Sequence, residues 1–499
     1  MQKETTQLVE LDRQRTLLTH IDALLGWDQE TYLPKSAVEE RAEQIALVQG
    51  LAHEKAVDPK IGGLLADLEK NPGLGSLEKA YLRVSRREHD KETKLPPDFV
   101  MEMARQTSLA QAAWAEARGT DNFALFAPHL EKMIELNKRM AAYINPEAKP
   151  YDVLLDLYEE GSTEESIAGI FAEMKADLLR VLAKIESRPQ VDDAFLHRKV
   201  SPERQALISQ YLMDAVGFEK DKGRLDTVAH PFTTTVGAAD IRITTRYIED
   251  LFASSMFSTI HESGHALYEM GIDPDPEFRG TRLAEPVSMA VHESQSRMWE
   301  NMIGRSQAFW KPHFGKIREL AGGALDDVGL NAFVLAINKV QPSLIRTEAD
   351  EVTYGLHIIA RFELESAIMA GRLSVADIPE AWNAKMKELL GLDVPNNASG
   401  CLQDIHWSMG SFGYFPSYAL GNLYAAQFWH QMHIDIPDLE SQIASGNSAV
   451  PLAWLRKNVH CHGSFYKPDE LLKKATGESL SPRYFAAYLD TKYAAIYGY

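Results

Sequence analysis

The segment 256–271, MFSTIHESGHALYEMG, carries two histidines four residues apart, with a glutamate directly after the first. On an α-helix, residues i and i+4 lie on one face, about 6 Å apart at Cβ, so the rings of His261 and His265 can reach one metal ion. Glu262 lies one position further round, where it can take a proton from a water bound to that ion. The segment therefore predicts a helix that carries a metal site and its catalytic base.

A third ligand is required, because a catalytic Zn²⁺ site has three protein ligands and one open position. The pattern HExxHxxGxxH is excluded, since Tyr268 stands where it needs glycine and Gly271 where it needs histidine. The segment 287–301, VSMAVHESQSRMWEN, offers His292 and Glu293 on a second predicted helix. We expect Glu293 to be the third ligand. His292 is expected either to support the ligands without binding the metal itself or to be the alternative ligand.

The segment 400–424, GCLQDIHWSMGSFGYFPSYALGNLY, brings several aromatic residues into a short stretch. Aromatic residues at such spacing usually belong to a hydrophobic core. Metal-dependent peptide hydrolysis also needs a donor to the developing oxyanion, and histidine or tyrosine commonly supplies it. His406, Tyr414 and Tyr418 are therefore candidates for the active site.

Arg346 stands in an acidic stretch at 344–357, LIRTEADEVTYGLH. One interpretation is a structural ion pair with Glu348 or Asp350. The other is recognition of a substrate carboxylate, because a planar guanidinium donates two parallel hydrogen bonds to it. A group of the second kind gives a peptidase its preference for a chain terminus.

Most of the chain has apolar residues in steps of three and four, the pattern of amphipathic helices. Proline and glycine clusters separate these segments. The predicted helices lie at 5–25, 34–52, 78–92, 97–118, 127–144, 163–187, 202–216, 306–321, 328–340 and 356–371. The fold class predicted from this pattern is all-α.

The segment 230–247, HPFTTTVGAADIRITTRY, departs from the helical pattern because it is dense in β-branched residues around a Gly-Ala-Ala-Asp turn. It predicts a short hairpin that leads directly into the helix of His261. The hairpin is either a structural flap or part of the binding site. We expect the backbone from Ile241 to Thr245 to be an edge strand that pairs with an extended peptide, which would make specificity broad.

Composition narrows the class of protein. The chain has 499 residues, 45% of them hydrophobic, and a formal net charge of −19. This charge repels phosphate, so it disfavours nucleic-acid and anionic-membrane partners. The N-terminus lacks the apolar segment of a signal peptide, and the chain has only two cysteines. We expect a cytoplasmic enzyme.

Six short motifs follow one another along the chain. They are His230-Pro231-Phe232, Asp240-x-Arg242-x-Thr244, His261-Glu262-x-x-His265, His292-Glu293-Ser294-Gln295, Ile345-Arg346-x-x-Ala349-Asp350 and Gly400-x-x-Gln403-Asp404-x-His406-Trp407. Together they resemble the signature of the carboxypeptidase Taq-type zinc metallocarboxypeptidases. LLGWDQETYLP at 24–34 also resembles that family, so the likeness spans nearly the whole chain.

The resemblance implies a predominantly helical fold over 1–499, with a small sheet beside a long groove, as in angiotensin-converting enzyme and neurolysin. Helices within about 1–150 would form one wall or lid of this groove. The implied metal ligands are His261, His265 and Glu293. The implied catalytic residues are Glu262, His406 and Tyr418, and the substrate-binding candidates are Arg346, Tyr414 (near the leaving residue), Arg242 and His230.

The resemblance also implies a Zn²⁺ cofactor, which Co²⁺ or another divalent ion could replace in vitro, and a homodimer that acts on peptides. The function expected is removal of C-terminal residues with broad specificity. One alternative is an oligoendopeptidase or dipeptidyl carboxypeptidase with the same metal site. Another is a catalytically inactive helical peptide-binding protein, although the retained Glu262 argues against it.

Overall fold

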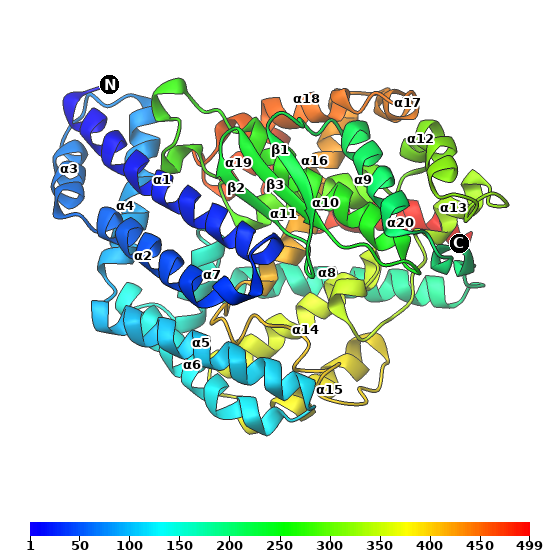
Figure 1. Ribbon diagram of the computed structural model, residues 1–499, viewed down its shortest axis with the longest axis horizontal. Coiled ribbons are helices and arrows are strands. Elements are labelled where there is room, and N and C mark those ends of the chain that lie inside the picture. The colour runs from blue at the N-terminus through cyan, green and yellow to red at the C-terminus, as the bar shows by residue number, and fades with distance from the viewer.

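Helices make up 68% of the chain in the computed structural model, which describes residues 1–499 (Figure 1). The all-α class is therefore confirmed. The first half contains α1 (Lys3–Thr31), α2 (Val38–Ala56), α3 (Pro59–Glu69), α4 (Ser76–Thr93), α5 (Pro97–Gly119), α6 (Phe123–Ile144), α7 (Pro150–Tyr158), α8 (Glu164–Glu186) and α9 (Pro202–Val216). None of the helices combines the length and apolar character that a membrane span requires.

The second half holds the helices of the predicted site. They are α10 (Phe252–Gly271), α11 (Met289–Arg297) with a π-helical continuation (Met298–Ile303), α12 (Gln307–Leu320), α13 (Leu330–Ala336), α14 (Glu351–Met369), α15 (Ile378–Leu390), α16 (Phe415–Asp435), α17 (Leu439–Ala444), α18 (Ala449–Asn458), α19 (Pro468–Thr476) and α20 (Arg483–Tyr497). Helix α14 begins five residues before the predicted segment, because the Asp350 carboxylate accepts hydrogen bonds from the Val352 and Thr353 amides.

Three separate hydrophobic cores support the fold, and the smallest of them holds 6 buried residues of α9, β3, α10 and the segment after α9. The main core contains 90 buried residues, and its first member along the chain is Phe99. Helices α1, α3 and α4 instead share a core of 10 buried residues, which includes Leu8, Leu65 and Tyr81 and is completed by Phe278 from the loop after α10. In Figure 1 the N-terminal helices, in blue, accordingly form a distinct layer at one side of the molecule.

A three-stranded sheet lies beside α10 (Figure 1). Its strands are β1 (Gly223–Thr227), β2 (Thr233–Gly237) and β3 (Asp240–Thr245), in the order β1-β3-β2. Strands β2 and β3 form the predicted antiparallel hairpin, and β1 adds a parallel pairing that the sequence did not suggest. Ile241 and Ile243 are fully buried, which turns one face of β3 toward the core.

The expectation that Ile241 to Thr245 is an edge strand is wrong. This segment is β3, the central strand, and both its edges are occupied, by β1 and by β2. The hairpin pattern could not reveal this, because β1 lies outside the hairpin. The outer strands are β1 and β2, and Thr233 of β2 contacts Glu262.

Two glycines allow the site helices to approach closely. A Cβ at Gly264 of α10 would lie 2.7 Å from Ser296 Cα of α11. A Cβ at Gly421 of α16 would lie 2.6 Å from Glu293 Cγ. Only glycine fits at either position without a shift of the neighbouring helix. These contacts fix α11 between α10 and α16, and so fix the position of Glu293.

Candidate active site

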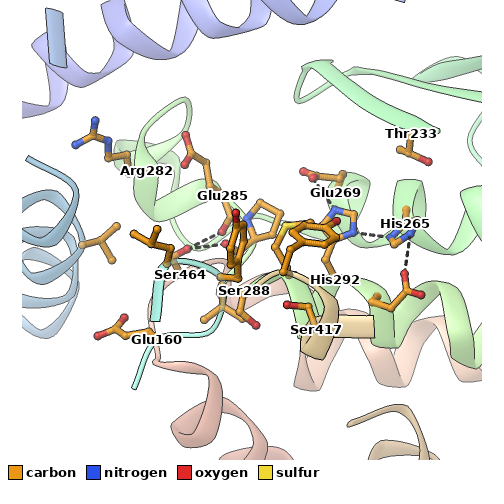
Figure 2. A pocket seen from close by; sticks show the side chains of 18 of the residues that line it. Glu160, Thr233, His265, Glu269, Arg282, Glu285, Ser288, His292, Ser417 and Ser464 are labelled. Carbon is orange, nitrogen blue, oxygen red and sulfur yellow. Dashed lines mark hydrogen bonds and ion pairs between the residues drawn. The ribbon is translucent and has the colours of Figure 1, made fainter. Parts of the chain in front are cut away.

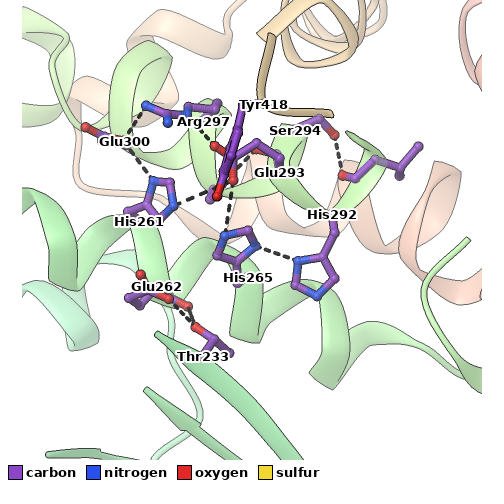
Figure 3. A network of polar contacts seen from close by, with 12 residues as sticks. Thr233, His261, Glu262, His265, His292, Glu293, Ser294, Arg297, Glu300 and Tyr418 are labelled. Carbon is purple, nitrogen blue, oxygen red and sulfur yellow. Dashed lines mark hydrogen bonds and ion pairs between the residues drawn. The ribbon is translucent and has the colours of Figure 1, made fainter. Parts of the chain in front are cut away.

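The three predicted metal ligands lie together. His261 and His265 are one turn apart on α10, and Glu293 projects toward them from α11 (Figure 3). Their ligand atoms all lie within 4.8 Å of one another. Glu293 Oε2 is 3.3 Å from His265 Nε2 and 3.7 Å from His261 Nε2. These separations suit a single ion, since tetrahedral Zn²⁺ sites hold nitrogen and oxygen ligands at about 2.0–2.2 Å.

The atoms that face away from the cluster are held by other side chains. His261 Nδ1 lies 2.9 Å from Glu300 Oε2. Arg297 Nε donates to Glu293 Oε1 at 2.7 Å. Such contacts fix the orientation of each ligand and leave His261 Nε2 and Glu293 Oε2 directed at a common point. Two imidazoles and one carboxylate are a donor set that fits a catalytic Zn²⁺ ion.

His292 lies beside His265 and outside the cluster (Figures 2 and 3). Its Nδ1 is 2.5 Å from His265 Nδ1, and its Nε2 is 3.0 Å from Glu269 Oε1. Both of its nitrogens are thus engaged away from the ligand atoms. Of the two roles expected for His292, this arrangement favours support of His265 over direct ligation.

The ionisation of His265 and Glu293 suits metal binding, whereas Glu293 and Glu300 raise the pKa of His261 despite its burial, so a bound ion must displace the proton of that ring. Burial lowers the pKa of His265 to about 3, so its imidazole is neutral at physiological pH. Burial acts to raise the pKa of Glu293, but Arg297 and His261 outweigh it and hold that pKa well below its usual range. A neutral imidazole and an ionised carboxylate are the forms that bind a metal ion.

Glu262, the residue after His261 on α10, contacts the sheet. Its Oε2 accepts a hydrogen bond from Thr233 Oγ1 at 2.6 Å (Figure 3). Burial raises the pKa of Glu262, which makes it a stronger proton acceptor than an exposed glutamate. The carboxylate expected to be the base is therefore both positioned and tuned for that role.

Two cavities meet at the cluster. The first, of about 720 Å³, extends toward α4 (Figure 2). The second, of about 740 Å³, extends toward Arg346. The walls that they share contain Pro231, His261, Glu262, Glu293 and Tyr418. A peptide that crosses the metal site would thus have space on both sides of the bond to be cut.

Arg346 pairs with neither Glu348 nor Asp350, so the structural pairing weighed from the sequence is wrong. Its Nε and Nη2 donate to Asp404 Oδ1 at 3.0 and 2.8 Å. Its Nη1 donates to the hydroxyl of Tyr354 at 3.1 Å. The side chain is buried yet lines the second cavity. A guanidinium with five donors and three engaged retains two for a substrate.

The aromatic candidates divide between the cavities. Tyr418 lines both, while Tyr414 lines only the first. The Tyr414 ring packs on that of Tyr418, with ring centres 5.2 Å apart, and the hydroxyl of Tyr354 contacts Arg346, so the place of Tyr414 near a leaving residue stays a prediction. His406 lies behind Tyr418, with its Nε2 3.2 Å from the Tyr418 hydroxyl. Tyr418 is thus closer than His406 to the space in which a substrate carbonyl would lie.

The structure does not bring Arg242 or His230 to the cluster. Arg242 donates to both oxygens of Asp240, two residues away on the same face of β3. Its guanidinium lies 4.1 Å from the centre of the Trp27 ring on α1, so it joins the sheet to the N-terminal layer. His230 is exposed, and only its neighbour Pro231 lines the cavities.

Comparisons with known proteins agree with this geometry. Residues 7–493 match the model of the family described as carboxypeptidase Taq (M32) metallopeptidase. The chain belongs to this family. It is 42% identical to thermostable carboxypeptidase 1 of Thermus thermophilus, over 98% of each protein. It also superimposes on the crystal structure of an M32 carboxypeptidase from Deinococcus radiodurans with a TM-score of 0.97, at 39% identity and complete coverage of both chains.

Further relatives of this M32 chain are also named carboxypeptidases. Carboxypeptidase 1 of Bacillus subtilis is 41% identical over 95% of each protein. The structure titled Trypanosoma cruzi metallocarboxypeptidase 1 is 34% identical, covers 98% of this chain and 99% of its own, and has a TM-score of 0.93. The chain is therefore a metallocarboxypeptidase, and the oligoendopeptidase and inactive-protein alternatives are not favoured.

Sequence reasoning missed several residues that support the M32 site. Arg297 follows Glu293 by four residues on one helix, a spacing that could have revealed the pair. Glu300 belongs to the π-helical turn after α11, and a 3.6-residue period cannot place it. Thr233 and Glu269 reach the site from β2 and from the end of α10, and no local pattern distinguishes them.

Proposed function

We propose that the chain is a zinc-dependent exopeptidase that releases single residues from the C-terminus of peptides with broad specificity. The observation that carries this proposal is Arg346, a buried guanidinium on the wall of the cavity that opens from the metal cluster. A peptidase with a metal and a base cuts any bond placed over them. Preference for a terminus needs a group that binds the terminal carboxylate, and Arg346 has the matching shape and charge.

The proposed reaction assigns one role to each residue. A bound divalent ion would act as a Lewis acid toward the scissile carbonyl and lower the pKa of the attacking water. Glu262 accepts the proton of that water. The hydroxyl of Thr233 holds the Glu262 carboxylate in place. The Tyr418 hydroxyl donates to the carbonyl oxygen as negative charge develops there. Arg346 binds the carboxylate of the residue that leaves.

Broad specificity follows if the substrate is bound mainly through its backbone. Strand β2 is at the edge of the sheet, and Phe232 and Thr233 at its start line the first cavity. An extended peptide could add to this edge, since main-chain hydrogen bonds do not depend on side-chain identity. We propose β2, in place of β3, as the strand that a substrate pairs with.

We further propose a cytoplasmic homodimer with peptides as its only partners. The acidic charge and the scarcity of cysteine support the location. Family resemblance supports the homodimer, as do exposed apolar side chains on two neighbouring helices, Leu17 and Ile21 on α1 and Leu47 and Leu51 on α2. Light scattering coupled to gel filtration tests it: a mass of about 56 kDa would contradict a dimer, since one chain is 55.9 kDa.

The central test is mass spectrometry of peptide digests. A peptide with a free C-terminus should yield a ladder that shortens by one residue at a time, and a chelator should abolish it. Refilling the chelated protein with Zn²⁺, Co²⁺ or Mn²⁺ in parallel identifies the preferred ion. Internal cleavage products, or release of dipeptides, would contradict the proposal.

A further inference from the structure

Two buried arginines share one aspartate behind the second cavity. Arg346 donates to Asp404 Oδ1, and Arg361 Nε donates to Asp404 Oδ2 at 2.8 Å. Arg361 Nη2 also lies 2.6 Å from that oxygen. The Arg361 side chain, on α14, is 0% exposed. Both oxygens of the aspartate are thus committed, one to each arginine.

No second anion contacts either guanidinium group. The remaining contacts of the guanidinium groups are neutral: Arg346 donates to the Tyr354 hydroxyl and Arg361 to the carbonyl of His357. Burial, reinforced by the nearby arginines, lowers the pKa of both His357 and His406 to about 3, so these rings carry no charge. The local sum is two positive charges and one negative charge.

Glu365, one turn further along α14, does not pair with Arg361 either. It accepts hydrogen bonds from Tyr151, Trp407 and the backbone amide of Gly413. Burial raises its pKa to about 7, and its hydrogen bonds are all made with these three groups and none with either arginine. Among the groups in contact an excess of one positive charge therefore remains on side chains that are themselves buried, which is unfavourable unless a ligand compensates it.

Only one member of this group faces the substrate space. Arg346 lines the second cavity, whereas Arg361 and Asp404 lie behind it. A terminal carboxylate bound at Arg346 would restore the balance to two positive and two negative charges. If Arg361 were absent, Asp404 alone would neutralise Arg346, and a substrate carboxylate would add a second anion to one cation.

We propose that Arg361 is a positioning residue for recognition of the substrate's C-terminal carboxylate: by sharing Asp404, it leaves Arg346 with a positive charge that the substrate balances. The inference rests on the proposed function, in which Arg346 binds this carboxylate. It assigns to Arg361 an electrostatic effect on binding, without contact to the substrate. The preference for a free C-terminus then arises from three side chains, of which one touches the peptide.

Steady-state kinetics on matched peptides tests the role of Arg361. The substrates are one N-blocked peptide with a free C-terminus and the same peptide amidated. Arg361→Gln should raise KM for the free acid about tenfold, leave kcat within about twofold, and reduce the preference for acid over amide about tenfold. Arg361→Lys should restore most of this preference, because it keeps the charge. Arg372→Gln, an exposed position just beyond α14, controls for the change in net charge.

Asp404→Asn is a second variant whose effect has the opposite sign. It removes the shared anion, so free phenylalanine, a probe of carboxylate binding, should inhibit the folded variant about tenfold more strongly than it inhibits the unmodified enzyme. A role that is merely structural would weaken binding in both variants. Circular dichroism and thermal melting establish which variants fold, and a folded Asp404→Asn decides the matter if Arg361→Gln does not fold.

The outcomes distinguish failure of the proposed role of Arg346 from failure of the proposed role of Arg361. If the unmodified enzyme cuts acid and amide equally well, the proposed role of Arg346 fails, and the inference on Arg361 fails with it. If the unmodified enzyme prefers the acid but a folded Arg361→Gln keeps the same KM and preference, only the inference is overturned. Weaker inhibition of Asp404→Asn by phenylalanine would also overturn it.

Discussion

The hydroxyl of Thr233 lies 2.6 Å from Oε2 of Glu262, so the outer strand of the sheet holds the carboxylate of the HExxH motif. The same strand is at the edge of the sheet, and its first residue, Thr233, lines the first cavity. A substrate that pairs with β2 would therefore be placed by the same element that orients the base. This arrangement links peptide binding to the position of the reacting group.

Replacement of Glu293 by alanine should remove the metal and the activity together, because two histidines alone form a weak site. Metal content of the purified variant, measured by plasma mass spectrometry, checks this. His292→Ala is the matched control: it removes a group that backs His265, so metal affinity should fall only about 10–100-fold. Full metal occupancy in Glu293→Ala would point to a different third ligand.

Glu262→Gln should lower turnover without removing the metal, unlike replacement of a metal ligand. The amide keeps the shape of the side chain and leaves His261, His265 and Glu293 in place, but it cannot accept the proton of the attacking water. Metal content should stay near one ion per chain, while kcat should fall by at least about 10²-fold. Near-normal turnover by the metal-loaded variant would remove Glu262 from the mechanism.

Arg346→Ala should abolish most of the preference for a free C-terminus. The loss should be about 10²-fold in kcat/KM on a free acid, while the amidated peptide is cut poorly by both proteins. Arg346→Lys should rescue in part, because it has the charge without the two parallel donors. Efficient cleavage of amidated peptides by the unmodified enzyme would instead indicate an oligoendopeptidase.

Glu365 should make stability depend on pH. Its pKa is raised by burial from 4.5 to about 7, so the folded protein binds this proton more tightly than the unfolded chain does. Its contribution to stability is complete below about pH 4.5 and is lost as pH rises through about 7, an effect of about 3 kcal/mol. Urea unfolding of Glu365→Gln between pH 4.5 and 8 should lack this decline. Glu363→Gln, half-buried on the same helix, should retain it.

Trp27→Ala and Arg242→Ala should affect stability and not substrate binding. Trp27 is 5% exposed and its ring packs on the Arg242 guanidinium, which joins α1 to the sheet. Loss of the indole should cost about 3–5 kcal/mol, as for other buried tryptophans. Arg242→Ala should lower the melting temperature by less and leave KM within about twofold. A large rise in KM for Arg242→Ala would restore it as a substrate-binding residue.

Helices that bury one face and expose the other could be predicted from the sequence. The spacing of apolar residues placed most helices before residue 220, because each buries one face. It did not place α16, since that helix is buried on nearly all sides and has no polar face to set a period. Strand β1 was also missed, because a five-residue strand with one buried side chain gives too little signal.

The clustering of His261, His265 and Glu293 was predictable because metal chemistry constrains local spacing, with the two histidines one turn apart and Glu293 on a later helix. The partner of Arg346 was not, since Asp404 is 58 residues away and only the folded chain brings the two together. For Arg242, in contrast, the sequence suggested a role in substrate binding that its contacts do not support. It belongs to a recognisable motif, but its neighbours Asp240 and Trp27 give it a structural contact.

The separate core of α1, α3 and α4 has a consequence for cooperativity. A layer that buries only 10 residues of its own, beside a core of 90, forms a unit of lower local stability. Its amide protons should exchange with solvent through partial opening, well before those of α10 or α14. Since α4 lines the first cavity, the same opening would widen the path along which a peptide enters or leaves. Turnover would then be sensitive to the stability of helices that contain none of the reacting groups.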